Sequence, residues 1–256
     1  MRQAADNMAV DEAMLLCHRR GLVPPTLRFY GWCPPAVSIG YSQRLREEVD
    51  LETCRRLGIG WVRRPTGGRA VLHDQEVTYS VVISQELLPG SVMETYRWLA
   101  GGLLAGLREL GIRAEMAEGN RGKALSGACF DAPSSCEVVV GGRKLVGSAQ
   151  ARQQGTILQH GSILIRFDPG KLASVLRLEA GAGKRVAAAL EKKVTSLEEE
   201  LGRPVSFEEV ARAVAGGFRK ELGIELQPDG LTREEEELAA ELEGKKYRHE
   251  GWNHRR

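Results

Sequence analysis

Cysteine is the residue type of this chain best suited to nucleophilic chemistry. An odd number of cysteines without a CxxC pair argues against a disulfide framework and a zinc site, so we expect reduced thiols at Cys17, Cys33, Cys54, Cys129 and Cys136. Cys129 lies in LSGACFDAPSSCE, a run of small residues without periodicity that is typical of an accessible loop. A thiolate there can attack a thioester if an ammonium group lowers its pKa. The alternative is a buried, inert thiol, which suits Cys17, Cys54 and Cys136 better.

Lys144 is the nearest downstream candidate for such an ammonium group. It follows a glycine pair at 141–142, and strand alternation groups it with every second residue after it: Val146, Ser148 and Gln150. A lysine aimed inward there could polarise a carbonyl or hold a thiolate. A solvated lysine beside a turn is the alternative. Gly147 weakens a strand interior, which often marks close approach by a ligand.

The segment RRPTGGRAVLHD, residues 63–74, is the most concentrated polar and glycine-rich stretch. Gly67 and Gly68 allow positive φ, and their amides can hold a carbonyl or phosphate oxygen. A tight hairpin loop with solvated arginines is the alternative. His73 and His160 can each act as an acid or a base, or serve as hydrogen-bonded structural residues.

These residues need a scaffold, and local patterns predict it. We expect a helix from Asn7, as a possible N-cap, to Gly21, and a second helix over 45–58. Capping-box spacings begin further helices at Ser91, Ser206 and Thr232. The first of these places one apolar face in the core: Val92, Tyr96, Leu99, Leu103, Leu107 and Leu110. Strand-like runs occupy 26–32, 36–42, 71–84, 137–140, 143–150 and 156–167, and the last three predict an antiparallel meander.

The order of these elements favours an α+β fold, with a mixed, largely antiparallel β-sheet flanked by helices and a helical C-terminal part. We expect a catalytic core over 1–184 and a helical part over 185–256. A net charge of +2, without a basic stripe, argues against nucleic-acid binding. No apolar run is long enough for a membrane span and no signal peptide is recognisable, so we expect a cytoplasmic protein.

Three segments, taken in this order, resemble the superfamily of lipoate-protein ligases, octanoyltransferases and biotin-protein ligases: NMAVDEA (7–13), RRPTGGRAVLHDQEVTYS (63–80) and GRKLVGSAQARQQGTILQHGSIL (142–164). The segment SGACFDAPSSCE (126–137) is similar to the one that carries the reactive cysteine in octanoyl-carrier-protein:protein octanoyltransferases of the Gram-positive type. The resemblance also implies a strand before Asn7, and since six residues precede it, a truncated or misassigned start is expected.

The resemblance implies roles for individual residues. Cys129 would be the acyl-thioester nucleophile, and Lys144 would lower the pKa of its thiol and contact the acyl carbonyl. The acyl-pocket loop would comprise Arg64, Gly67, Gly68, Arg69 and His73. The strands that frame the pocket would contribute Gly147, Ser148, His160 and Gly161. A second thiol at Cys136, where the family more commonly has an aromatic residue, leaves open a regulatory disulfide.

The implied reaction moves octanoyl from octanoyl-acyl carrier protein, through Cys129, to a lysine of a lipoyl-domain protein such as the glycine-cleavage H protein. It requires no cofactor or metal. An acidic carrier would be attracted by a basic rim near Arg63, Arg64 and Arg69. The alternatives are an ATP-dependent lipoate-protein ligase, an amidotransferase that takes octanoyl from H protein, and a non-catalytic carrier-binding regulatory protein.

Overall fold

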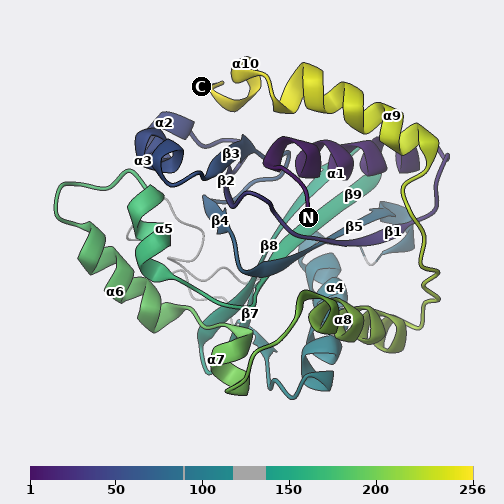
Figure 1. The fold of residues 1–256 in the computed structure, drawn as a ribbon. Helices are drawn as coiled ribbons and strands as arrows, with labels where there is room; N and C mark the ends of the chain where they lie inside the picture. Colours follow the sequence, from purple (N-terminus) through teal and green to yellow (C-terminus); the bar gives the residue numbers. More distant parts are fainter. Residues whose placement is uncertain (89, 118–136, 256) are drawn as a thin grey trace.

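The main sheet of this chain has six strands, in a computed structural model that describes residues 1–88, 90–117 and 137–255 (Figure 1). Its order is β1-β5-β9-β8-β7-β6, and all neighbouring strands run antiparallel. Their bounds are β1 Thr26–Tyr30, β5 Glu76–Ser84, β6 Glu115–Met116, β7 Val138–Val140, β8 Arg143–Gln153 and β9 Thr156–Leu164. The expected largely antiparallel sheet and the β7-β8-β9 meander are confirmed. Cys129 and Cys136 lie outside the described residues.

The β7-β8 connection is a two-residue turn, as the glycine pair predicts. Gly141 and Gly142 have φ of 54° and 77°, which an Asn-Gly or Gly-Gly type I′ turn requires at both central positions. This turn fixes the register with Val140 opposite Arg143. It also determines where Lys144 enters the sheet, as the second residue after the turn.

A second, three-stranded sheet packs beside the first. Its order is β3-β2-β4, from β2 Ala36–Ile39, β3 Gly60–Arg63 and β4 Val71–His73, with β2 parallel to β3 and antiparallel to β4. The expected run over 71–84 is therefore a pair of strands, β4 and β5, that belong to different sheets. The chain crosses from one sheet to the other directly after His73.

Two helical expectations in the first sixty residues need correction. The helix over 45–58 is two helices, α2 Leu45–Glu48 and α3 Leu51–Arg56, because Asp50 has an extended backbone and caps the second with its side chain. The first helix, α1, spans Ala4–Arg19 and begins before Asn7, which is buried inside it. The Asn7 amide donates instead to the Gly31 carbonyl at 3.0 Å, so it joins the helix to the chain after β1. Gly21 ends this helix with φ of 71°, as expected.

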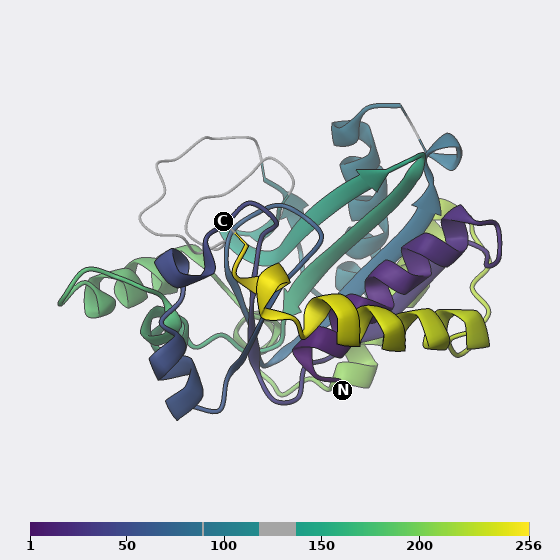
Figure 2. The same ribbon diagram turned by 90° about the horizontal axis from the view of Figure 1, so that it is seen from above.

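Helices cover both faces of the main sheet (Figures 1 and 2). On one face, α4 Val92–Glu109 begins with the expected Ser91-Glu94 capping box and packs against α8 Phe207–Leu222. A Cβ on Gly106 would lie 2.5 Å from the Val214 Cα, so glycine is needed where these two helices touch. Three of the expected core residues of α4 are buried: Leu99, Leu103 and Leu107. Val92, expected among them, is 47% exposed because it stands in the first turn.

On the other face, α1 lies against the sheet and α9 Arg233–Leu242 lies along α1 (Figures 1 and 2). The C-terminal part is helical as expected, and helices in fact begin before residue 185. The remaining elements are η1 Gln85–Leu87, α5 Pro169–Val175, α6 Gly183–Lys193, α7 Leu197–Leu201, η3 Glu243–Tyr247 and α10 Glu250–Asn253. The division at 184/185 falls inside α6 and stays a prediction. No helix among the described residues is long and apolar enough to cross a membrane.

Candidate active site

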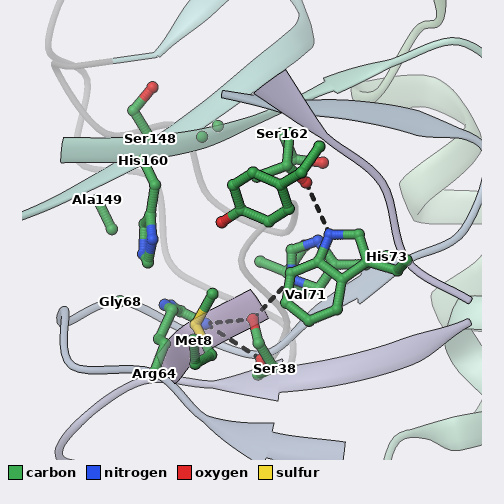
Figure 3. A pocket seen from close by; sticks show the side chains of 15 residues that line it. Met8, Ser38, Arg64, Gly68, Val71, His73, Ser148, Ala149, His160 and Ser162 are labelled. Atoms are coloured by element: carbon green, nitrogen blue, oxygen red, sulfur yellow. Dashed lines mark hydrogen bonds between the residues drawn. The ribbon is translucent and has the colours of Figure 1, made fainter. Parts of the chain in front are cut away.

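A pocket lies between the two sheets and α1, and it holds most of the residues that the sequence singled out (Figure 3). Its empty volume is about 430 Å³, a figure that includes the open space at its mouth. Its lining residues are Met8, Tyr30, Trp32, Ser38, Arg64, Gly68, Val71, His73, Thr78, Gly147, Ser148, Ala149, His160, Gly161 and Ser162. Of the expected site residues among those described, Gly67, Arg69 and Lys144 are not in this lining.

Burial distinguishes the closed end of the pocket from its mouth. Trp32, Thr78 and Ser162 are each at most 4% exposed and form the closed end. Gly68 is exposed and Ala149 is half-buried, so the mouth lies between the glycine loop and β8.

His160 reaches the pocket from β9 and is held by hydrogen bonds at both ring nitrogens. Its Nδ1 lies 3.0 Å from the Asp11 Oδ2, and its Nε2 lies 2.7 Å from the Thr66 hydroxyl. Burial lowers the pKa of His160 below its ordinary value, so the ring is neutral at pH 7. A neutral ring beside a carboxylate carries its proton on Nδ1, and the Thr66 hydroxyl therefore donates to Nε2.

Asp11 stays ionised although it is fully buried. Burial alone would raise the pKa of its carboxyl group, but the hydrogen bond from His160 and the charge of Arg28 together lower it. Arg28 Nη1 and the Tyr30 hydroxyl donate to this carboxylate at 2.7 Å each, and the Ser80 hydroxyl donates at 2.9 Å. One carboxylate on α1 thus fixes side chains from β1, β5 and β9.

His73 is the second pocket histidine, and it has an equivalent arrangement. Its Nδ1 lies 2.7 Å from the Glu76 Oε1, and its Nε2 lies 2.7 Å from the Ser38 hydroxyl. The Trp32 ring stacks on it at 4.0 Å between centroids. The indole N–H of Trp32 donates to the Thr78 hydroxyl at 2.7 Å, which in turn donates to Glu76.

These two networks determine what the pocket can bind. The polar atoms of both histidines and of Trp32 are engaged with protein partners, so the surfaces left for a ligand are ring faces, methyl groups and methylenes. A pocket whose polar groups are satisfied internally favours an apolar ligand, because burying an alkyl chain there desolvates no unpaired polar atom. The arrangement fits an acyl chain with its polar end at the mouth.

The arginines of the glycine loop do not form the expected basic rim. Arg64 is 4% exposed, and its guanidinium donates to backbone oxygens of the loop, those of Gly67 and Arg69, each at 2.8 Å. It also donates to the Ser38 hydroxyl at 3.0 Å, on the pocket wall. Arg64 therefore shapes the loop from inside, and it cannot attract a carrier protein. Arg69 is half-buried, and Gly67 is exposed outside the pocket lining.

Arg63 is fully buried, which also contradicts the expected rim. Its guanidinium donates to the backbone carbonyls of two segments. One is the loop after β2 (Gly40, Tyr41 and Gln43), and the other is the C-terminal end (Trp252, Asn253 and Arg255). This arginine ties the end of the chain to the strand that leads into the glycine loop.

Glycine is required where the loop and strands approach most closely. Gly68 has φ of 93°, and a Cβ there would lie 2.7 Å from the Arg64 Nη2. A Cβ on Gly161 would lie 2.5 Å from the Tyr79 ring and 2.8 Å from the Gly147 carbonyl oxygen. The Ser148 hydroxyl pairs with the Tyr79 hydroxyl at 2.8 Å, on the face of β8 opposite His160. Gly147 and Gly161 therefore contribute backbone surface to the pocket.

Lys144 lies on β8 upstream of the pocket residues, and a bulge changes its expected face. Val138 pairs with Val146 whereas Val139 pairs with Lys144, so Leu145 is an extra residue in β8. Leu145 and Val146 are both buried in the same apolar cluster, and the alternation is interrupted between them. Lys144 therefore shares its face with Gly147, on the pocket side, and the expected grouping with Val146 and Ser148 is wrong.

The Lys144 ammonium is 3% exposed and forms an ion pair with Glu137, the residue before β7. Lys144 and Gly147 are three residues apart, a separation of about 10 Å along a strand. The lysine therefore lies on the Gly147 side of the pocket, where Gly147 pairs with Ser162, and it is one side chain's length from the lining. Its expected partner, Cys129, lies outside the described residues.

Two other cysteines have the buried environment expected of them. Cys17 and Cys54 are both 0% exposed. Burial raises the pKa of the Cys54 thiol to about 11 and also raises that of Cys17. Neither thiol is suited to attack a thioester near neutral pH.

Sequence reasoning missed the two carboxylates that hold the histidines, Asp11 and Glu76. Asp11 follows Met8 by three positions in α1, so a charge falls on the buried face of a helix, and that placement was an available signal. Glu76 had no comparable signal, because it begins a strand in which every residue up to Ile83 is buried. Ser38 was missed for the same reason, since every residue of β2 is buried, whereas Thr66 is a buried residue of the loop after β3.

A helix-flanked antiparallel sheet with a narrow apolar pocket agrees with a sequence profile match. The profile of the family named lipoyl protein ligase A/B catalytic domain matches residues 3–219. The chain belongs to this family. The match includes the glycine loop, the pocket strands and most of α8.

Individual relatives show which proteins of this family the chain is similar to. Octanoyltransferase LipM of Symbiobacterium thermophilum is 52% identical over 262 residues, which cover 100% of this chain and 96% of that protein. Octanoyltransferase LipM of Kyrpidia tusciae is 54% identical, over 99% of this chain and 95% of that protein. The resemblance to octanoyltransferases is thereby confirmed, and with it an acyltransferase enzyme.

Solved structures have the same fold. A lipoate-protein ligase A bound with ATP superposes with a TM-score of 0.84 at 32% identity, over 99% of this chain and 96% of that chain. The bipartite lipoate protein ligase of Thermoplasma acidophilum, described together with its E2 lipoyl domain, has a TM-score of 0.83 at 31% identity, over 99% and 93%. The α+β assignment with a helical C-terminal part is confirmed.

Proposed function

We propose that this chain is an octanoyltransferase of lipoate biosynthesis that moves octanoyl from octanoyl-acyl carrier protein to a lysine of a lipoyl-domain protein. The acceptor would be a protein such as the glycine-cleavage H protein. The observation that carries the proposal is the apolar pocket with Lys144 on the same face of β8 as Gly147 of its lining, in a chain about half identical to octanoyltransferases over its full length.

The first step is acylation of Cys129. Its thiolate attacks the carbonyl carbon of the carrier thioester, a new carbon–sulfur bond forms, and the carrier thiolate leaves and takes a proton. The octanoyl chain would lie in the pocket, in contact with the Trp32 ring. Gly147 and Gly161 would let the chain pass close to the strand backbone.

The second step transfers the acyl group to nitrogen. The neutral amine of the acceptor lysine attacks the octanoyl-enzyme thioester, loses a proton, and releases Cys129 as a thiol. Lys144 would hold the thiolate in the first step and the developing oxyanion in both. A thioester is converted to a more stable amide, so the reaction needs neither nucleotide nor metal.

The site residues of the pocket would act by position. His160 and His73 have both ring nitrogens occupied by protein partners, so we assign them the walls of the acyl pocket. Arg64, Gly67, Gly68 and Arg69 would form the loop at its mouth. Ser148 would hold β8 against Tyr79.

The test is intact-mass measurement after incubation with octanoyl-acyl carrier protein in the absence of ATP. We expect one octanoyl adduct, its loss in Cys129→Ala, and its discharge onto a lysine when H protein is added. Lys144→Ala should slow acylation strongly at neutral pH and recover in part at higher pH. An adduct that survives Cys129→Ala would contradict the thioester mechanism.

A second candidate is an ATP-dependent lipoate-protein ligase, because a ligase bound with ATP has the same fold over 99% of this chain. Modification of H protein only with ATP and free octanoic or lipoic acid would favour that activity. Acylation of this chain by octanoyl-H protein, but not by octanoyl-acyl carrier protein, would favour the amidotransferase. Carrier binding without any adduct would favour a regulatory protein.

A further inference from the structure

The burial of Arg63 and Arg64 means that an electrostatic attraction for a carrier protein has to come from another surface. Exposed cations near Lys144 are the candidates, because Lys144 is where the proposed thioester chemistry takes place. Helix α6, Gly183–Lys193, ends next to that lysine and carries four basic residues and one acidic residue.

The two faces of α6 are chemically distinct. Val186 and Leu190 are buried on one side, where the helix packs on α5. The opposite side exposes a basic face, defined here as Lys184, Arg185 and Lys192. These three side chains form no ion pair with any residue in the described ranges. Helical periodicity brings them together around Ala188, with Glu191 at the edge.

The end of α6 is joined to the β8 backbone at Lys144. The Thr195 N–H, two residues beyond the helix, donates to the Lys144 carbonyl oxygen at 2.9 Å, and Val194 forms a parallel bridge with Lys144. Lys192 is therefore two residues from the segment that contacts the proposed catalytic lysine. Since α6 has 11 residues, its basic face extends about 16 Å from that point.

Helices α6 and α9 carry opposite net charge. Helix α9 has five acidic residues and one basic residue, and α6 and α9 lie at opposite ends of the molecule in both views (Figures 1 and 2). An acidic protein is attracted by the exposed cations of α6 and repelled by the glutamates of α9, so these two helices favour one orientation of its encounter with this chain.

From this geometry we infer that the basic face of α6 is the docking surface for an acidic protein, and that this protein is the carrier that presents the octanoyl thioester. The inference rests on the proposed function. The occupant is the donor because its thioester is attached through a long, flexible phosphopantetheine arm. Such an arm can extend from a body docked along α6 to Lys144, whereas an acceptor lysine must dock directly at the thioester.

The test compares acylation rates of two triple variants with those of the unmodified protein. In one variant, Lys184→Glu, Arg185→Glu and Lys192→Glu reverse the basic face. In the matched control, Arg212→Glu, Arg219→Glu and Lys220→Glu make the same change of net charge on the exposed side of α8. Each protein is given two donors: octanoyl-acyl carrier protein, and octanoyl-pantetheine, which has the arm without the protein.

We expect the α6 variant to react with octanoyl-acyl carrier protein at least about tenfold more slowly than the control, at low salt, and equally fast with octanoyl-pantetheine. The difference between the variants should shrink as salt screens the charges, over a Debye length of about 10 Å at 0.1 M. Replacement of the same three α6 residues by glutamine should give an intermediate rate.

Three results would overturn the inference: equal rates for the two variants with the carrier, an equal loss with both donors, or normal acylation followed by slowed transfer to the acceptor. The last would mean that the acceptor docks on α6. Failure of the proposed function has a different signature, since the unmodified protein would then acquire no octanoyl adduct from either donor.

Discussion

Asp11 and His160 are joined by a hydrogen bond of 3.0 Å between residues 149 positions apart in the sequence. The first stands on α1 and the second on β9, so the bond fixes the helix against the sheet beside the pocket. Since the carboxylate is fully buried and ionised, it contributes to stability and to the shape of the acyl pocket at once.

Asp11→Asn should destabilise the fold. The amide cannot neutralise Arg28, whose guanidinium is largely buried against it, and removal of one member of a buried ion pair costs about 3 kcal/mol or more. Urea unfolding would measure the loss. Asp6→Asn, on the exposed side of the same helix, should change the free energy of unfolding by about 0.5 kcal/mol or less. Equal losses in both variants would contradict the role given to Asp11.

Lys144 and Glu137 allow stability to be separated from catalysis. Lys144→Met leaves the buried Glu137 carboxylate without its lysine partner, and should lower the free energy of unfolding by about 3 kcal/mol. Adding Glu137→Gln should restore most of that loss, because the buried charge is then removed as well. Acylation should stay slow in the double variant. A double variant that acylates at the original rate would show that Lys144 acts only in folding.

Arg63→Lys should destabilise the link between the C-terminal end and the loop after β2. An ammonium group has three donors, whereas the guanidinium reaches six backbone carbonyls, and each lost bond costs about 1 kcal/mol. We expect the free energy of unfolding, measured with urea, to fall by about 3 kcal/mol. Proteolysis near residue 252 should become faster. Arg219→Lys, on the exposed side of α8, is the control and should be neutral. Unchanged proteolysis would contradict the link.

Local patterns were enough to predict the elements that depend on neighbouring residues. The predictions of the Gly141-Gly142 turn and the Ser91-Glu94 capping box are confirmed, because the residues that form these features are adjacent or three positions apart. The family segments predicted which strands meet at the pocket. They also predicted that residues of the glycine loop lie close to residues of β8 and β9, as they do in the pocket lining.

Long-range partners explain what the sequence did not reveal. Arg63 resembled a solvated loop residue, because its acceptors are backbone carbonyls near the C-terminus that have no signature in side-chain type. The predicted face of Lys144 was wrong because a single extra residue, Leu145, interrupts the alternation of side chains along β8. Bulges of this kind depend on the partner strand as much as on the sequence that contains them.

Gly161→Ala should displace the strand that forms the pocket wall, because the added Cβ would lie on the face of the sheet that holds Tyr79, opposite His160. The new methyl group would overlap the Tyr79 ring and the Gly147 carbonyl, and overpacking of this kind costs about 1–3 kcal/mol. We expect a lower midpoint in urea and slower acylation by octanoyl-pantetheine. Gly244→Ala, where no atom lies within 4 Å of the added Cβ, should leave both unchanged. Normal acylation by the Gly161 variant would mean that the overlap is accommodated without displacing the pocket wall.

Stability should fall as the pH is lowered from 7.5 to 5.5, and His160 should account for part of this loss. Burial lowers the pKa of His160 in the folded protein, whereas in the unfolded chain a histidine titrates near about 6.5. Below about pH 6.5 the unfolded state therefore binds more protons, and the free energy of unfolding decreases with falling pH. Asp11 contributes to stability in a lower pH range. Its pKa is also lowered in the folded protein, so the stability it contributes is present above about pH 4 and lost below.

Urea unfolding of His160→Gln and of the unmodified protein at several pH values would measure the contribution of His160. The variant should show the shallower slope between pH 7 and 5.5, and the two slopes should agree above pH 7.5. Equal slopes throughout would mean that His160 gains no proton on unfolding.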